Sequence, residues 1–155
     1  MLVFGYMRLL GIDYGMKRIG VAISDEGATL AFPKEIVPNG LKLAPLKRTG
    51  EIIKEEELSE IVIGESVDFS GSLNMLMAHI ELFITELENE FHLPVHKQKE
   101  FLTSVEARRS KDGKKELSPS QSHSKLKSTK AGRVDASAAA LILQRYLDKM
   151  NNIKK

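Results

Sequence analysis

The chain has 155 residues, of which 42% are hydrophobic and 28% are charged, and it contains no cysteine. This length and composition predict one compact domain over residues 1–155 and exclude a chain that is disordered throughout. The lack of cysteine excludes a disulfide framework, a thiolate metal site and a cysteine nucleophile. No apolar run is long enough to span a bilayer, and no secretory signal opens the chain. We therefore expect a soluble, cytoplasmic protein with no membrane partner.

The net charge of +2 hides an uneven distribution along the chain. Residues 108–133 carry nine Lys or Arg against two Asp or Glu. Residues 110–132 are also poor in apolar side chains, so they bury too little surface to offset the entropy lost on ordering. We expect a mobile basic loop over 110–132. Such a loop either attracts a phosphate backbone or is a solvated insertion.

The first part of the chain predicts three antiparallel strands. Residues 7–13 and 18–24 show the apolar pattern of strands, and the turn at Tyr14, Gly15 and Met16 joins them as a hairpin. The third run, residues 29–37, contains Pro33, which confines such a strand to a sheet edge or a bulge. Residues 1–6 are a short extension with no assigned role.

The remaining segments alternate between helix and strand patterns. Apolar residues at helical spacing predict a helix over 41–58, and the continuous apolar run at 61–64 predicts a strand buried on both faces of a parallel sheet. A long helix follows residues 70–72, a short strand begins at 93, a short helix covers 103–109, and a last helix runs from about Val134 to Met150. This order predicts an α/β fold.

Four segments in this order resemble the YqgF family. They are residues 11–22 (GIDYGMKRIGVA), residues 61–64 with 68–71 (IVIG and DFSG), residues 100–107 (EFLTSVEA) and residues 134–139 (VDASAA). The resemblance extends over residues 7–148. The family is described as a pre-16S ribosomal RNA nuclease or as Holliday-junction-resolvase-like. The resemblance implies a ribonuclease H-like fold, whose mixed β-sheet has three antiparallel strands followed by parallel ones and is flanked by helices.

The resemblance also implies an acidic catalytic site. The family positions that bind metal and catalyse correspond here to Asp13, Glu100 and Asp135. Paired divalent ions held by carboxylates neutralise a phosphate and activate water, and carboxylate oxygens suit Mg²⁺ or Mn²⁺. Taken singly, Asp13 is equally a turn residue, Glu100 a solvated charge and Asp135 a helix cap. The three together favour the catalytic interpretation.

Further residues are predicted to contact nucleic acid, and each has a structural alternative. Lys17 and Arg18 either guide a phosphate or form a solvated face. Ser70 and Gly71 precede a helix whose first backbone amides either bind an anion or are satisfied by an ordinary helix cap. In the basic loop the predicted contacts are Lys111, Lys114, Lys115, Lys125, Lys127 and Lys130.

The sequence argues against three other kinds of site. The four histidines are dispersed without the spacing of zinc ligands, and no Gly-x-Ser-x-Gly nucleophile motif occurs. The phosphate motif of actin-like ATPases is similar to residues 11–15, but those enzymes need two such domains.

The chain departs from the family pattern around its second acid. The family carries Asp-Glu-Arg where this chain has Lys99, Glu100 and Phe101. Lys99 is expected to compete with a cation for the oxygens of Glu100, and Phe101 removes a guanidinium that could clamp a phosphate. After Gly64 the family's Leu-Pro is replaced by Glu65 and Ser66.

The prediction is a metal-dependent nuclease that processes the 5′ end of the 16S ribosomal RNA precursor. One alternative is a Holliday-junction-resolvase-like DNA endonuclease, which must make two symmetric cuts and is therefore expected to be a homodimer. The others are a module that binds nucleic acid without cutting it and a structural assembly factor.

Overall fold

The computed structural model describes residues 7–40, 44–67, 73–101 and 124–153. Within these ranges five strands and three helices follow one another along the chain. They are β1 (Leu9–Tyr14), β2 (Arg18–Ser24), β3 (Ala31–Pro38), α1 (Ala44–Glu55), β4 (Glu60–Val67), α2 (Leu73–Phe91), β5 (Val95–Phe101) and α4 (Ser124–Ile153). None of the helices in these ranges is long and apolar enough to cross a membrane.

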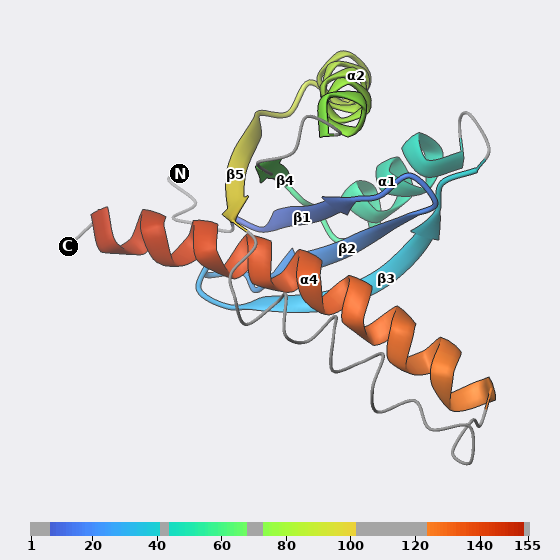
Figure 1. The fold of residues 1–155 in the computed structure, drawn as a ribbon. Coiled ribbons are helices and arrows are strands. Elements are labelled where there is room, and N and C mark those ends of the chain that lie inside the picture. The colour runs from blue at the N-terminus through green and yellow to red at the C-terminus, as the bar shows by residue number, and fades with distance from the viewer. Residues whose placement is uncertain (1–6, 41–43, 68–72, 102–123, 154–155) are drawn as a thin grey trace.

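All five strands form one sheet in the order β3-β2-β1-β4-β5. β1 pairs antiparallel with β2, and β2 with β3, whereas β4 pairs parallel with β1, and β5 with β4. This is the predicted mixed sheet, with three antiparallel strands first in the chain and parallel strands after them. Because β1, β4 and β5 are parallel, their carboxyl ends lie at one edge of the sheet. That edge is also where the β1–β2 connection turns (Figure 1).

Helices cover both faces of the sheet (Figure 1). Leu10, Ile12 and Ile63 pack in one apolar cluster with residues of α1 and α2, while Leu9 and Val62 pack in a second cluster with α4. Adjacent strand residues point to opposite faces, so a central strand with cover on both sides is apolar throughout. Ile61, Val62 and Ile63 are all fully buried, which confirms the prediction for this strand.

The third strand confirms the rule for proline in a sheet. β3 is the edge strand beside β2, and its register shifts where Val21 pairs with Glu35 and Ala22 with Pro33. Lys34 is thus the extra residue of a bulge. Proline has no N–H for the ladder, so an edge and a bulge both accommodate it.

One close approach fixes α4 on the sheet. A Cβ added to Gly11 would lie 2.7 Å from the Cβ of Leu143 and 3.0 Å from the carbonyl oxygen of Ala139. Both atoms belong to the helix framework rather than to the end of a flexible side chain. The absence of a side chain at Gly11 therefore lets α4 pack directly against β1.

Several predicted boundaries are wrong. α4 begins at Ser124, ten residues before the predicted start, so residues 124–132 of the expected loop are helical. The rest of that loop, residues 110–123, lies outside the described residues. Lys, Leu and Ala favour helix, and a helix already anchored by packing extends at little cost. α1 is shorter than predicted and β5 is longer. Residues 1–6, Ser70, Gly71 and the expected helix over 103–109 lie outside the described residues.

Candidate active site at the carboxyl edge of the sheet

Asp13 lies at the carboxyl edge of the sheet, one residue before the end of β1. It pairs with Gly20 of β2. Because side chains alternate along a strand, Asp13 shares the α4 face with Gly11. The carboxylate borders a surface hollow of about 210 Å³ that is also lined by Gly15, Lys17, Arg18 and Gly20. The predicted position of Asp13 at a strand end is confirmed.

The hairpin connection brings two basic residues to the same hollow. A Cβ on Gly15 would lie 2.5 Å from the carbonyl oxygen of Arg18, so only glycine permits this tight turn. Asn39 holds the turn from the end of β3, since its backbone N–H donates to the Lys17 carbonyl at 2.9 Å and its side-chain amide donates to the Gly15 carbonyl at 2.7 Å. Lys17 and Arg18 are both exposed.

Glu100 lies inside β5, not beyond it as the sequence suggested. β1 pairs Ile12 with Ile63, and β4 pairs Gly64 with Gln98 and Ser66 with Glu100. By this register Asp13, the residue after Ile12, is level with Gly64 of β4 and Gln98 of β5. The backbone of Glu100 therefore lies two residues closer to the carboxyl edge than Asp13, with β4 between them. The backbone therefore brings the two acids to the same edge.

Asp135 lies within α4, eleven residues after its first residue, not at a helix start. This position removes the capping alternative, because the helix N-terminus lies elsewhere. Residue 135 is about one helical turn before Ala139, whose carbonyl lies against Gly11. Figure 1 shows that α4 runs from the hairpin end of the sheet toward the start of β1, so this turn lies on the side of Asp13.

The described residues fit a hard divalent cation only in part. The side chain of Asp13 is described, whereas those of Glu100 and Asp135 lie outside the description, and among the described side chains no group of three His, Cys, Asp or Glu could hold a metal ion. The donor set is nevertheless all carboxylate, which suits Mg²⁺ or Mn²⁺. The backbone positions converge from three separate elements, as such a site requires.

Lys99 does not lie where the sequence suggested. Lys97 forms an ion pair with Glu81 of α2, so it points to the α2 face, and Lys99, two residues on, shares that face. Asp13 is on the opposite face. Lys99 is exposed, and its position does not favour competition for a cation beside Asp13.

The sequence analysis missed Gln98. It pairs with Gly64 of β4, and its buried Oε1 has no hydrogen-bond partner among the residues that the structure describes. Strand alternation puts it on the same face as Asp13, with only the glycine between them in the sheet. A buried acceptor without a partner is unusual, since such groups are nearly always paired. The only signal in the sequence was the alternation from His96 to Gln98, which was hidden because β5 was predicted too short.

The clearest electrostatic network lies away from this edge and is structural. Arg48 of α1 donates to both carboxylate oxygens of Glu35 on β3, at 2.8 and 2.6 Å. These bonds hold the pKa of Glu35 below its usual value and raise that of Arg48.

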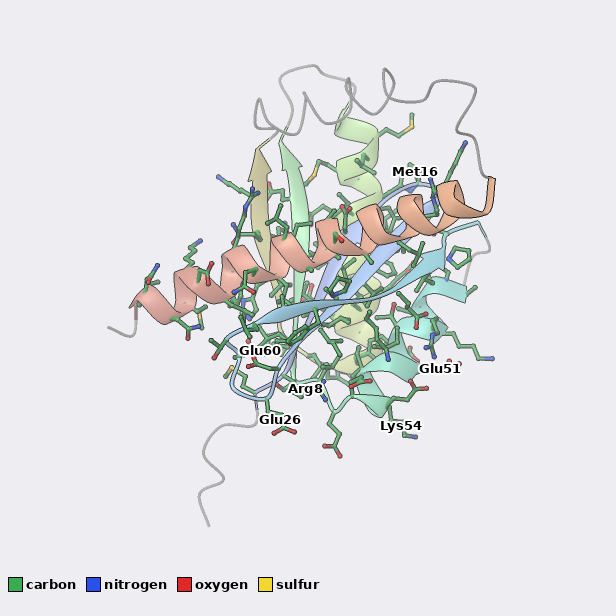
Figure 2. All side chains as sticks on the ribbon, turned by 90° about the horizontal axis from the view of Figure 1, so that it is seen from below. Arg8, Met16, Glu26, Glu51, Lys54 and Glu60 are labelled. Atoms are coloured by element: carbon green, nitrogen blue, oxygen red, sulfur yellow. The ribbon has the colours of Figure 1, made fainter. Side chains whose placement is uncertain are left out.

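Figure 2 shows Met16, in the hairpin connection, at the other end of the sheet from Arg8, Glu26 and Glu60.

The remaining predicted contacts are only partly described. Lys125, Lys127 and Lys130 belong to the first turns of α4, although nothing is described of their side chains. Lys111, Lys114, Lys115, Ser70 and Gly71 lie outside the described residues.

Comparison with known protein families assigns the chain to one of them. The family model described as RuvX, Holliday junction resolvase, matches residues 7–149. The chain belongs to the RuvX (YqgF) family. This confirms the resemblance that the four sequence segments carried, and the match extends over nearly the whole of the chain.

Two proteins of the same name are similar to nearly the whole chain. A protein of Ruminiclostridium cellulolyticum named "Putative pre-16S rRNA nuclease" is 39% identical over 151 residues, which are 96% of this chain and 99% of that protein. A protein of the same name from Thermoanaerobacter pseudethanolicus is 34% identical over 146 residues, 94% of this chain and 99% of that protein.

A solved structure, T. thermophilus RuvC in complex with Holliday junction substrate, is 20% identical, with a TM-score of 0.42, and covers 60% of this chain and 63% of that chain.

Proposed function

We propose that this protein is a metal-dependent nuclease that hydrolyses phosphodiester bonds in the precursor of 16S ribosomal RNA, near its 5′ end. The observation that carries the proposal is the convergence at one sheet edge of Asp13, the backbone of Glu100 and the α4 turn that contains Asp135. The names of the full-length relatives support the choice of substrate. We also propose that the whole chain acts as a single cytoplasmic domain.

Asp13, Glu100 and Asp135 would hold Mg²⁺ or Mn²⁺. Such an ion supplies charge neutralisation at the phosphate and a more acidic water. Asp13 lines the hollow, and the turn fixed by Gly15 and Asn39 follows it directly at this edge of the sheet.

Lys17 and Arg18 orient the substrate in this account. Their exposed cationic groups border the same hollow as Asp13, so they attract a phosphate next to the acidic site. The lysines of 111–130 add attraction that does not depend on sequence. Neutralising Lys111, Lys114, Lys115, Lys125, Lys127 and Lys130 together should weaken binding and flatten its dependence on salt, and an unchanged slope would remove them from the interface.

Cleavage of a four-way DNA junction is the second candidate, because the matching family model carries that description. The test compares labelled precursor RNA with a labelled four-way junction, each with Mg²⁺, with Mn²⁺ or with EDTA. Metal-dependent cutting of the RNA alone supports the proposal. Cutting of the junction alone, by a homodimer, would replace it with the resolvase, and binding without cutting under every ion would replace it with a binding module.

A further inference from the structure

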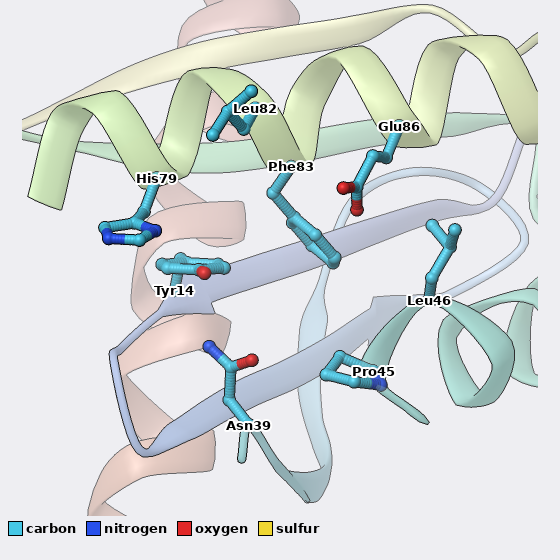
Figure 3. Close-up of a pocket in the computed structure, with 8 residues that line it drawn as sticks. All are labelled: Tyr14, Asn39, Pro45, Leu46, His79, Leu82, Phe83 and Glu86. Carbon is cyan, nitrogen blue, oxygen red and sulfur yellow. The ribbon is translucent and has the colours of Figure 1, made fainter. Parts of the chain in front are cut away.

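A second hollow lies on the other face of β1 from Asp13 (Figure 3). It has a volume of about 130 Å³. It is bordered by the sheet, the start of α1 and one side of α2, and its described lining includes Tyr14, Asn39, Leu46, His79, Phe83 and Glu86. None of these residues was assigned a role above other than Asn39, which holds the hairpin turn.

The hollow has aromatic walls. The rings of Tyr14 and Phe83 are 5.2 Å apart and inclined at 47°, and Figure 3 shows the imidazole of His79 above the ring of Tyr14. Leu82, which is 62% exposed, and Leu46 complete the apolar lining. Flat aromatic surfaces beside a nucleic-acid path are the usual platforms for nucleobases, because every base has a π face that can stack.

Two polar side chains at this hollow, those of Asn39 and Glu86, present acceptor oxygens. The amide nitrogen of Asn39 is used in the bond to Gly15, which leaves its oxygen directed toward the pocket in Figure 3. Glu86 points its carboxylate toward the same space. A carboxylate there disfavours a phosphate but accepts hydrogen bonds from a base. Guanine presents two adjacent N–H donors, on N1 and on its exocyclic amine, which match the two oxygens of a carboxylate.

The two hollows are close because they share one turn. Tyr14 follows Asp13 directly, and Gly15, which borders the acidic hollow, accepts the hydrogen bond from Asn39, which borders the aromatic one. A nucleic-acid strand with one phosphate at Asp13 can therefore pass around the end of the β1–β2 hairpin. This path brings a neighbouring base of that strand to Tyr14. An unpaired base enters such a pocket at a lower cost than a paired one.

We propose that the hollow beside Tyr14 and Glu86 receives an unpaired guanine of the substrate strand and so selects where the strand is cut. The inference rests on the proposed nuclease function and adds base selectivity to it. The selected strand is single-stranded or locally opened at the cutting site, because only an unstacked base can leave the helix to reach this face of the sheet.

Binding is measured in EDTA, so that no strand is cut, with a short oligouridine RNA that carries one guanosine at each position in turn. We expect one position at which guanosine tightens binding about tenfold and inosine, which lacks the exocyclic amine, does not. Glu86→Gln should abolish that preference, because an amide offers a single acceptor oxygen. Glu90→Gln, also exposed on α2 but outside the hollow, is the matched control and should keep the preference.

Equal affinity for every RNA, or a guanosine preference that survives in Glu86→Gln, would overturn the proposal. An equal preference for adenosine would also overturn it, since adenine lacks the paired donors. Because binding is measured without metal, loss of the base preference is distinct from loss of cleavage. A preference without cleavage in Mg²⁺ would refute the nuclease and leave the guanine pocket in place.

Discussion

Substituting Gly11 by alanine tests whether the contact between α4 and β1 positions the acidic site. The new Cβ would lie 2.7 Å from the Leu143 Cβ, where ordinary contact begins at 3.4 Å, and it would also crowd the Ala139 carbonyl. Neither atom can rotate away, so helix and strand must part by several tenths of an ångström. Overpacking of this kind costs about 1–3 kcal/mol.

We expect Gly11→Ala to lower the free energy of unfolding in urea by about 1–3 kcal/mol. Cleavage should fall further than stability explains, because the shift moves the α4 turn that contains Asp135 away from Asp13. Gly27→Ala is the control, since a Cβ there makes only ordinary contacts, with the Thr29 hydroxyl at 3.5 Å and the Asp25 carboxylate at 3.9 Å. A Gly11→Ala protein as stable and as active as wild type would refute the close-approach argument.

Three further predictions concern charge. Substituting Lys17 and Arg18 together by glutamine should reduce the slope of log affinity against log salt concentration by about 1 to 2. The slope is measured by titration with single-stranded RNA. An unchanged slope would show that the phosphates of the substrate do not contact these two residues. Lys99→Gln should leave metal-dependent cleavage unchanged, because Lys99 shares the α2 face with Lys97, and a gain in metal affinity would contradict this. Arg48 lowers the pKa of Glu35 from its usual 4.5, so the stability that Glu35 adds is present above pH 4.5 and is lost as the pH falls through the lowered pKa. Between about pH 5 and pH 3 the melting temperature of Glu35→Gln should therefore fall less than that of wild type. An equal fall in both proteins would show that the Glu35–Arg48 ion pair adds no stability.

The sheet was predictable because its strands carry local signals. The alternation in β2 places Ile19, Val21 and Ile23 on one apolar face, and the fully apolar run in β4 follows from cover on both faces of the sheet. The proline in β3 follows from the place of that strand at the edge of the sheet. The extent of β5 was not predictable, since every residue from His96 to Glu100 is polar and neither face carries an apolar pattern. Lys97 and Lys99 are compatible with a strand because Lys97 pairs with Glu81 of α2.

The site was predictable only from the family resemblance. Asp13 has a local signal at a strand end, whereas Glu100 and Asp135 are distant in sequence. Their backbones come to the same end of the sheet only through the parallel pairing and the packing of α4 on Gly11. The aromatic hollow was missed because Tyr14, His79 and Phe83 come from two elements joined only in the fold. Pairwise spacing in the sequence carries no trace of that contact.

The most direct test of the account is cleavage by Asp13→Asn compared with wild type, in Mg²⁺ and in Mn²⁺, on the precursor RNA and the four-way junction. Glu26→Gln, an exposed acid at the other end of the sheet, is the control. The account predicts a folded Asp13→Asn protein with no metal-dependent cleavage and a control that cuts as wild type does. Cleavage by Asp13→Asn at the wild-type rate would contradict the assignment of the active site to this edge.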